Sequence, residues 1–226
     1  PYSYLWSNGE TTKDIEGVTA GIYLVTVRDA VDSLATASDT VSQPVPDNIL
    51  IDIEGNIYTT VKIGEQTWMQ QNLRVSVAPD STPITSYIYS GREDLEKTYG
   101  RLYTWDAAMN GSTSEKAQGI CPDGWHIPSD EEWKILEMYL GMTRAEADLS
   151  NTWRGQGVGA KLRPGGGSGY DVLYSGRRTT SGGYSLLEWY EYMWTSNESG
   201  SDAWRRCVDS TTAVTTIGRY NTFPKS

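Results

Sequence analysis

Apolar and polar residues alternate at the start of the chain in a pattern that predicts short β-strands. Tyr and Trp alternate with other residues over positions 2–6, and positions 22–27 form a largely apolar and β-branched run. Asn8-Gly9 and Ala20-Gly21 supply the positive φ angles that tight turns require. Residues 1–43 are therefore predicted to form a small, partial, all-β sandwich repeat.

Residues 36–47, which run from the end of this first region, are rich in Ser, Thr, Pro and Asp and are typical of an exposed segment. It contains Pro44 and Pro46, which restrict the backbone and favour an exposed, stiff linker over residues 44–48. The second domain is then predicted to span residues 49–226. It opens with three apolar runs at 49–53, 58–63 and 66–69, which are separated by turn residues and predict a three-strand meander.

Helical patterns occur in the middle of the second domain. Residues 76–99 have no clean period and are predicted to be a long loop, whereas 103–109 shift toward helix. Ser129 and Glu132 form a capping box ahead of Trp133, Leu136 and Leu140 on one helix face, and Gly141 ends that helix. A second capping box from Thr143 to Glu146 predicts a shorter helix that ends before Trp153.

No helix pattern returns after Gly155. Short β-like runs occur near residues 170–174, 192–195, 203–209 and 213–219. The order of strands, then helices, then strands with long loops predicts an α+β domain with two main helices against an antiparallel sheet.

Composition excludes several functional classes. The 226 residues carry a formal net charge of −10, and the 19 Lys and Arg are scattered, so nucleic acid is excluded as a partner. No run approaches the roughly eighteen apolar residues of a membrane span, and the start at Pro1 indicates a position within a longer polypeptide. Nine Trp and fifteen Tyr beside a single Phe provide rings that suit grooves as well as cores.

Few residues are available for metal binding or nucleophilic catalysis. Cys121 and Cys207 are the only cysteines, which excludes a four-cysteine metal site and permits one disulfide if their Cα atoms come within about 7 Å. His126 is the only histidine, so a catalytic triad would have to use it. A hydrogen-bonded structural role is the alternative that we favour for His126, and no catalytic residue is predicted.

The first region resembles a known repeat. Tyr4-x-Trp6-Ser7-Asn8-Gly9, Thr11-Thr12 and the run from Gly17 to Asp29 are similar to the SprB-like repeat of bacterial gliding and surface adhesins, over residues 2–42. Such repeats occur in tandem, which implies that this one is the last copy of a longer array and lacks its first strand.

Three blocks in the second region carry a more specific resemblance. They are Trp68-Met69-x-x-Asn72-Leu73, then Gly100-Arg101-Leu102-Tyr103-x-Trp105-x-Ala107-Ala108, then Cys121-Pro122-x-Gly124-Trp125-His126-Ile127-Pro128-Ser129-Asp130-x-Glu132-Trp133. Together they resemble the Fibrobacter succinogenes major paralogous domain, a family of secreted or surface modules abundant in Bacteroidetes and Fibrobacteres, over residues 50–226. Helix capping and the burial of Trp133 are sufficient to explain the residues of the last block.

The last block is also similar to the Leu-Pro-Thr-x-x-Glu-Trp element of formylglycine-generating enzymes, which implies a C-type-lectin-like fold. Oxidases of that fold use a cysteine pair in their C-terminal part, where this chain has Cys207 alone, and iron-dependent relatives need several histidines. In the paralogous family a cysteine of a closing strand accompanies the counterpart of Cys121. The chain ends before such a strand, so the domain is expected to lack it.

A partner surface is predicted in the segment from Tyr184 to Tyr220, which concentrates residue types typical of binding hot spots. The candidate binding residues are Tyr184, Trp189, Tyr190, Tyr192, Arg205, Arg206 and Tyr220. The alternative is that half of these rings fill the core of a Phe-poor domain, and Trp194 and Trp204 fit that role best.

One metal site is considered. Asn197, Glu198 and Asp202 offer oxygen ligands to calcium, although loops of this composition are usually solvated turns. The Glu-Pro-Asn, Gln-Pro-Asp and Trp-Asn-Asp strings of sugar-binding lectins do not occur. No cofactor is predicted, and calcium is the alternative.

Three functional hypotheses follow. The first is an extracellular or cell-surface binding or adhesion module, without enzymatic activity, that presents late loops to a protein or glycan. The second is a structural subunit or cap of a surface stalk, fibre or layer, in contact with neighbouring domains of a longer polypeptide. The third is an oxidase like the formylglycine-generating enzymes, which is the weakest because its ligands are absent.

Overall fold

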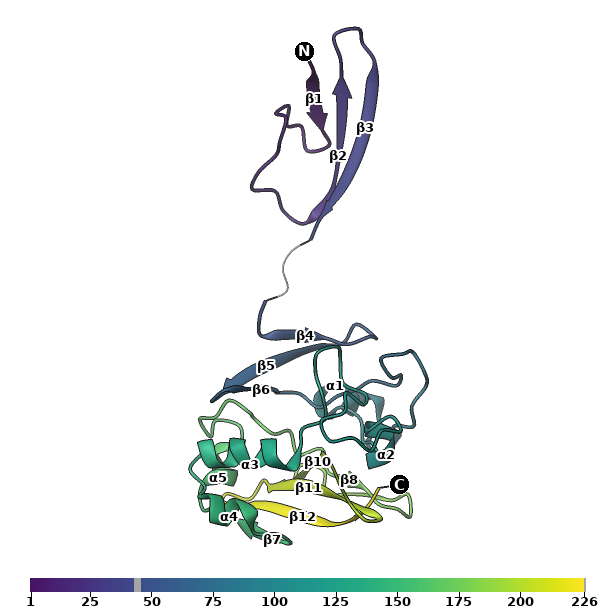
Figure 1. The fold of residues 1–226 in the computed structure, drawn as a ribbon. Helices are drawn as coiled ribbons and strands as arrows, with labels where there is room; N and C mark the ends of the chain where they lie inside the picture. Colours follow the sequence, from purple (N-terminus) through teal and green to yellow (C-terminus); the bar gives the residue numbers. More distant parts are fainter. Residues whose placement is uncertain (43–45, 226) are drawn as a thin grey trace. The chain divides into compact units, whose positions relative to one another are not determined.

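The structure, a computed structural model, describes residues 1–42 and 46–225. The chain divides into two compact units, Pro1–Asp47 and Asn48–Ser226. The division falls within the predicted linker, of which Pro44 lies outside the described residues. Each unit has its own sheets (Figure 1).

The first unit is a three-stranded antiparallel sheet in the order β1-β2-β3, formed by β1 (Ser3–Trp6), β2 (Gly21–Arg28) and β3 (Leu34–Val41). The alternating pattern and the turn residues therefore predicted β1 and β2, whereas β3 covers a Ser- and Thr-rich stretch that was not predicted to be a strand. Large apolar side chains remain exposed on it, including Ile22 at 74%. Within residues 1–42 there is one sheet and no second sheet packed on it, so the sandwich stays a prediction.

The second unit opens with the predicted meander. Strands β4 (Ile49–Ile51), β5 (Ile57–Ile63) and β6 (Gln66–Met69) form an antiparallel sheet in that order. The side chain of Asp52 organises the first turn, because its carboxylate accepts hydrogen bonds from the backbone of Glu54 and Asn56 and from the Tyr58 hydroxyl.

The predicted long loop at residues 76–99 contains helix, which corrects the prediction. A 3-10 turn (η1, Tyr89–Gly91) leads into α1 (Glu93–Tyr99). No side chain caps α1 and none of its residues is buried, so neither a cap nor an apolar stripe marks it in the sequence. Helix α2 (Trp105–Ala108) lies within the predicted segment, and the Thr104 side chain caps it.

Both predicted capping boxes are confirmed. Helix α3 (Asp130–Tyr139) begins after Ser129, whose hydroxyl accepts from the Glu132 backbone N–H while the Glu132 carboxylate accepts from the Ser129 backbone N–H. Helix α4 (Arg144–Asp148) begins in the same way after Thr143. Gly141 has a φ of 111° just after α3, a conformation that favours glycine.

The second half of the unit forms a four-stranded antiparallel sheet in the order β10-β11-β12-β7. Its strands are β7 (Thr152–Arg154), β10 (Tyr190–Ser199), β11 (Asp202–Asp209) and β12 (Ile217–Pro224). The predicted β-like runs at 192–195 and 203–209 lie in β10 and β11, and the run at 213–219 overlaps the start of β12. A short hairpin of β8 (Arg177–Arg178) and β9 (Tyr184–Ser185) precedes this sheet.

Two sequence predictions fail in this half. Residues 170–174 are not a strand, because Asp171 and Tyr174 have φ angles of 55° and 57° that break an extended run. A short helix, α5 (Val158–Lys161), occurs where no helix was predicted. Gly159 within it is required by packing, since a Cβ there would lie 2.1 Å from the Thr216 carbonyl oxygen. That glycine weakens the helical pattern in the sequence.

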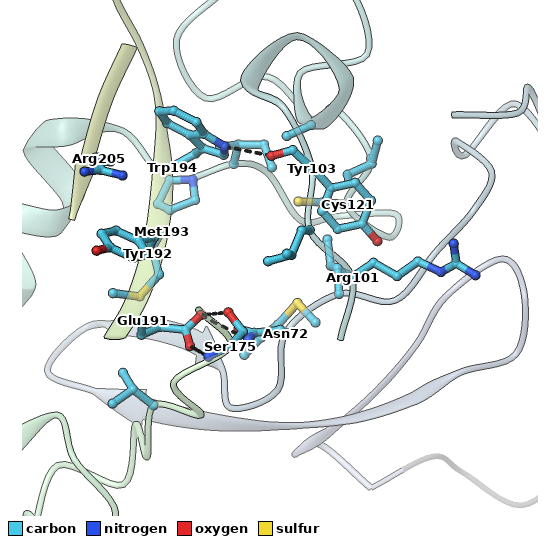
Figure 2. Close-up of a pocket in the computed structure, with 18 of the residues that line it drawn as sticks. Asn72, Arg101, Tyr103, Cys121, Ser175, Glu191, Tyr192, Met193, Trp194 and Arg205 are labelled. Atoms are coloured by element: carbon cyan, nitrogen blue, oxygen red, sulfur yellow. Dashed lines mark hydrogen bonds between the residues drawn. The ribbon is translucent and has the colours of Figure 1, made fainter. Parts of the chain in front are cut away.

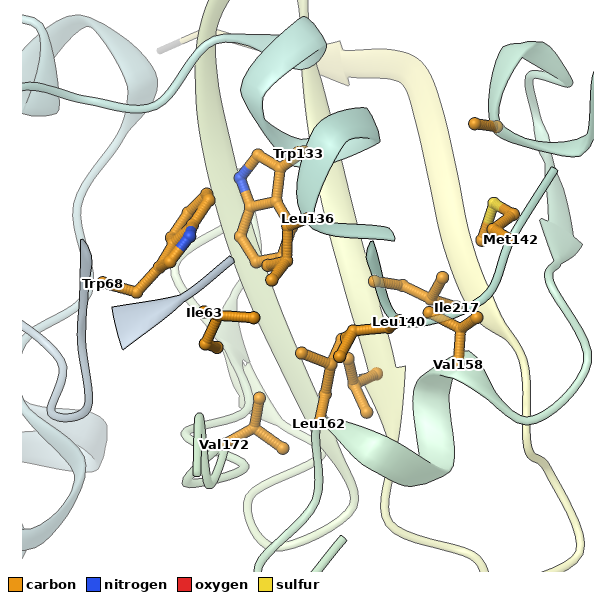
Figure 3. Packing of buried hydrophobic residues seen from close by; sticks show 12 residues of the cluster. Ile63, Trp68, Trp133, Leu136, Leu140, Met142, Val158, Leu162, Val172 and Ile217 are labelled. Atoms are coloured by element: carbon orange, nitrogen blue, oxygen red, sulfur yellow. The ribbon is translucent and has the colours of Figure 1, made fainter. Parts of the chain in front are cut away.

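Helix α3 packs between the meander and the four-stranded sheet. Trp133, Leu136 and Leu140 are buried in a cluster that also contains Ile63 and Trp68 of the meander and Val208 and Ile217 of the sheet (Figure 3). The predicted apolar face of this helix is therefore the centre of the core. Helices against antiparallel sheets make the unit α+β, as predicted.

Candidate ligand-binding cavity

A buried ionic network joins α3 to one face of the four-stranded sheet. Glu137 accepts from Arg206 at 2.7 Å and from Arg154 at 2.5 Å. Asp130 accepts from Arg206 at 2.7 Å and from Arg219 at 2.7 Å. Although burial opposes ionisation, hydrogen bonds and charge from the two arginines hold the pKa of Asp130 well below its usual value.

This network corrects one predicted binding residue. Arg206 is fully buried, and its guanidinium is occupied by Asp130 and Glu137. A side chain without exposure and with its donors used internally cannot meet a ligand. The prediction for Arg206 is therefore wrong, and its role is to fasten β11 to α3.

The opposite face of the sheet gathers four other predicted residues. The register places Trp194 opposite Arg205 and Arg205 opposite Tyr220, and cross-strand partners share a face. Tyr192 belongs to this face two residues before Trp194, and its ring stacks on Tyr190 with centroids 5.8 Å apart. The sequence could not show this convergence, because it depends on strand register.

Beside β10 lies a cavity of about 1190 Å³ (Figure 2). Tyr192, Met193 and Arg205 lie on one side of it, and Arg101 and Tyr103 lie on the opposite side. The Trp194 indole N–H donates to the Tyr103 carbonyl oxygen at 3.1 Å and so bridges the two sides. Of the predicted binding residues, Tyr192 and Arg205 line the cavity.

All three sequence blocks singled out above line this cavity. Their lining members are Trp68, Met69, Asn72, Leu73, Arg101, Leu102, Tyr103, Ala108, Cys121, Gly124, Trp125, His126, Ile127, Pro128, Glu132 and Trp133. Glu132 of the capping box is among them, so the last block both starts α3 and borders the cavity.

The first two blocks pack directly against each other. The Arg101 N–H donates to the Leu73 carbonyl at 2.9 Å, and the Asn72 side-chain amide donates to the Tyr99 carbonyl at 3.1 Å. Gly100 has a φ of 70°, and a Cβ there would lie 2.6 Å from the Asn72 Cβ. Glycine at this position allows the close approach that forms the wall.

Glu191 is a buried acid at the wall of the cavity. Its carboxylate accepts from the backbone N–H and hydroxyl of Ser175 and from the Asn72 amide. Burial raises the pKa of Glu191 to about 7, although these three donors oppose the shift. The sequence did not identify Glu191 or Asn72 as candidate site residues. Asn72 lies in the Trp68 to Leu73 block, whereas no pattern marked Glu191.

Buried polar atoms without a partner gather at the same place. Among the described residues, four such side-chain atoms occur: Gln66 Oε1, Trp68 Nε1, Trp133 Nε1 and Arg205 Nε. All four residues line the cavity. Buried polar groups are almost always hydrogen-bonded, so four such atoms bordering one cavity distinguish this part of the second unit.

The remaining predicted binding residues do not line the cavity. Tyr184 packs against Tyr89 with centroids 5.3 Å apart, and Trp189 is 60% exposed. Tyr190 stacks on Tyr192, and Tyr220 meets Phe223 edge to face. Tyr190 and Tyr220 therefore adjoin the cavity residues Tyr192 and Arg205 without bordering the cavity themselves.

The predicted disulfide is absent from this structure. Cys121 and Cys207 are both free and buried. Cys121 belongs to the second apolar cluster, whereas Cys207 lies in β11 opposite Gly218. Burial raises the pKa of each thiol to about 12, so both are protonated near neutral pH.

Two of the predicted calcium ligands have other bonds. Asn197 Oδ1 accepts from the Asp130 backbone N–H at 2.6 Å, and Glu198 pairs with Lys225 at 2.6 Å. Asp202 pairs with Ser199 and Pro224 in the sheet. Across the described part of the chain, no group of three or more His, Cys, Asp or Glu could hold a metal ion.

His126 has the structural contact that we favoured. Its Nε2 lies 3.0 Å from Glu132 Oε1, and Glu132 is the acid of the α3 capping box. The side chain also borders the cavity.

A model of the Fibrobacter succinogenes major domain matches residues 61–221, which include all three blocks. No curated protein and no solved structure matches the chain. No helix in the part of the chain that the structure describes has the length and apolar character needed to cross a bilayer.

Proposed function

This chain belongs to the Fibrobacter succinogenes major domain family, and from that premise we propose that it is an extracellular or cell-surface binding module whose second unit holds a saccharide in the cavity beside β10. The family resemblance supports the surface location. The combination of α3 with antiparallel sheets and long loops supports a C-type-lectin-like fold.

The observation that carries the proposal is the make-up of the cavity wall. Half-buried rings of Tyr87, Tyr103, Trp125, Tyr192 and Trp194 border the cavity together with amide side chains of Gln70, Gln71 and Asn72. Rings offer flat apolar faces for the C–H groups of a sugar. The amide N–H groups of Gln70, Gln71 and Asn72 donate within the protein, which positions these side chains along the wall. A hollow that also holds unpartnered indole N–H groups fits a ligand rich in acceptors.

Binding without catalysis is the form of activity that we propose. The Cys121 thiol at the wall has its pKa raised to about 12 by burial, which disfavours a nucleophilic thiolate. Glu132 next to His126 is already shared with the helix cap and Lys116. Neither group has the arrangement that a nucleophile and a base require.

A glycan array followed by calorimetry on the full chain tests this proposal. Saturable binding of a saccharide is expected, with at least about tenfold weaker affinity in Tyr192→Ala, since this ring borders the cavity. Trp189→Ala is the matched control, because Trp189 is an exposed aromatic outside the cavity. Loss of binding in the control alone would reject the cavity as the site, and binding of proteins but of no glycan would reject the saccharide.

A structural role in a surface array is a second candidate, supported by the first unit. Its sheet leaves Ile22, Leu24 and Leu34 exposed at 74%, 46% and 60%, and the turn between β2 and β3 leaves Val31 exposed at 81%. Exposed apolar side chains on one small sheet suit contact with a neighbouring repeat. Light scattering of the full chain and of Ile22→Lys tests this role, since self-association that the substitution abolishes would support it.

A further inference from the structure

We propose that the saccharide carries a carboxylate and that Arg205 binds it, so that the cavity selects acidic sugars of the uronic-acid class. This inference rests on the proposed function and adds the charge and the anchoring residue.

Arg205 is a buried cation without an anion. It is 8% exposed, and its Nε has no hydrogen-bond partner. Its guanidinium lies 4.4 Å from the Tyr192 ring centroid and also over the Phe223 ring, and all three residues line the cavity. Aromatic faces offset part of the cost of burying the charge, but they leave the N–H donors free.

The other buried arginines show what this domain does with such a charge. Arg154, Arg206 and Arg219 each pair with Asp130 or Glu137 at 2.5–2.7 Å. Within residues 1–42 and 46–225, Arg205 is the buried arginine that has no ion pair. A bound carboxylate would give it the partner that each of the others has.

The balance of charge along the cavity wall also favours an anion. Arg101, Glu65 and Glu132 of the wall each have an ion-pair partner. Three further arginines of the wall have no ion-pair partner among the described residues: Arg177, Arg178 and Arg205. The remaining acid of the wall is Glu191, and burial raises its pKa to about 7. The wall is therefore locally cationic in a chain whose net charge is −10.

A carboxylate fits this site better than a neutral hydroxyl. A guanidinium offers two parallel N–H donors that match the two oxygens of a planar carboxylate. The rings of Tyr192 and Phe223 keep water from the donors, which strengthens the pairing. The neighbouring aromatic rings favour a sugar over an acidic peptide as the carrier of that group.

Calorimetry on the full chain tests the inference with oligosaccharides of galacturonate, guluronate and mannuronate and with their methyl esters. At least one acid form is expected to bind about tenfold or more tightly than its ester, because esterification removes the charge and leaves the ring. Arg205→Met is expected to abolish that difference, and Arg205→Lys to retain part of it. Arg92→Met is the matched control, since Arg92 pairs with Asp94 on the surface outside the cavity.

A measurement on the unmodified chain covers the case in which Arg205→Met does not fold. The affinity for the acid should fall as sodium chloride rises, and that for the ester should not. Equal binding of acid and ester would overturn the role of Arg205 and leave the proposed function intact. Binding of no saccharide would overturn the proposed function as well. Binding of polyglutamate or of sulfated sugars in place of uronates would overturn the assignment of the ligand class.

Discussion

Arg205 and Arg206 are neighbours in the sequence and lie in opposite environments. Arg206 faces α3, where Asp130 and Glu137 bind its guanidinium. Arg205 faces the cavity, where its close contacts are the rings of Tyr192 and Phe223. Both side chains are buried, with Arg206 0% exposed and Arg205 8% exposed, so burial alone does not distinguish them.

The difference lies in whether the charge is matched by the protein itself. A matched pair such as Arg206 with Glu137 is part of the fold, and removal of one partner leaves the other charge buried. An unmatched cation such as Arg205 costs folding free energy, and the proposed carboxylate would supply the partner that the protein does not. Arg206 therefore belongs to the face of the sheet that meets α3, and Arg205 belongs to the opposite face.

The largest expected effect is on the face of the sheet that meets α3. Arg206→Met should lower the free energy of unfolding by about 3–5 kcal/mol, because Asp130 and Glu137 each lose a buried partner. Chemical denaturation monitored by tryptophan fluorescence measures it. A loss below about 1 kcal/mol would show that Arg206, despite its two ion pairs, contributes no more to the free energy of unfolding than Arg205 is expected to.

The next effect is a pH dependence on the cavity side. The folded pKa of Glu191 is raised from 4.5 to about 7, so its neutral form favours the fold. This stabilisation is complete below about pH 4.5 and is lost as the pH rises through 7, by about 3 kcal/mol. Unfolding free energies from pH 5 to 8 should fall in the unmodified chain.

The slope attributable to Glu191 should disappear in Glu191→Gln. The exposed Glu93→Gln serves as the control and should keep it. If the unmodified chain became more stable between pH 5 and 8, the assignment of this acid would be wrong.

A smaller effect is expected where α3 begins. Ser129→Ala removes the cap hydrogen bond to the Glu132 N–H and should cost about 1 kcal/mol. The loss would loosen the helix turn that carries Asp130 to the sheet. Thermal unfolding by circular dichroism measures it, and Ser114→Ala, an exposed serine outside any helix, should leave the melting temperature unchanged.

The smallest effect on stability is expected at Arg205. Arg205→Met should change the free energy of unfolding by less than about 1 kcal/mol, or increase it, because no internal partner is left without its cation. The same denaturation experiment as for Arg206→Met provides the measurement. A loss of 3 kcal/mol or more would show that Arg205 is structural.

Local signals in the sequence predicted much of the fold. The apolar runs of the meander, the capping boxes before α3 and α4 and the buried face of α3 were all recognisable, because each depends on residues close together in the chain. Helices α1 and α5 escaped prediction since they have no side-chain cap. The three family blocks pointed to the cavity wall without indicating a cavity.

The sequence alone was therefore sufficient for the elements with strong local signals, for the family and for a set of late aromatic and basic residues. Only the tertiary structure decided which of two adjacent arginines meets α3 and which meets a hollow. Strand alternation sets consecutive side chains on opposite faces, but the partner of each face comes from segments as far apart as Glu137 and Phe223. The separation of the two cysteines was decided in the same way, by packing between distant segments.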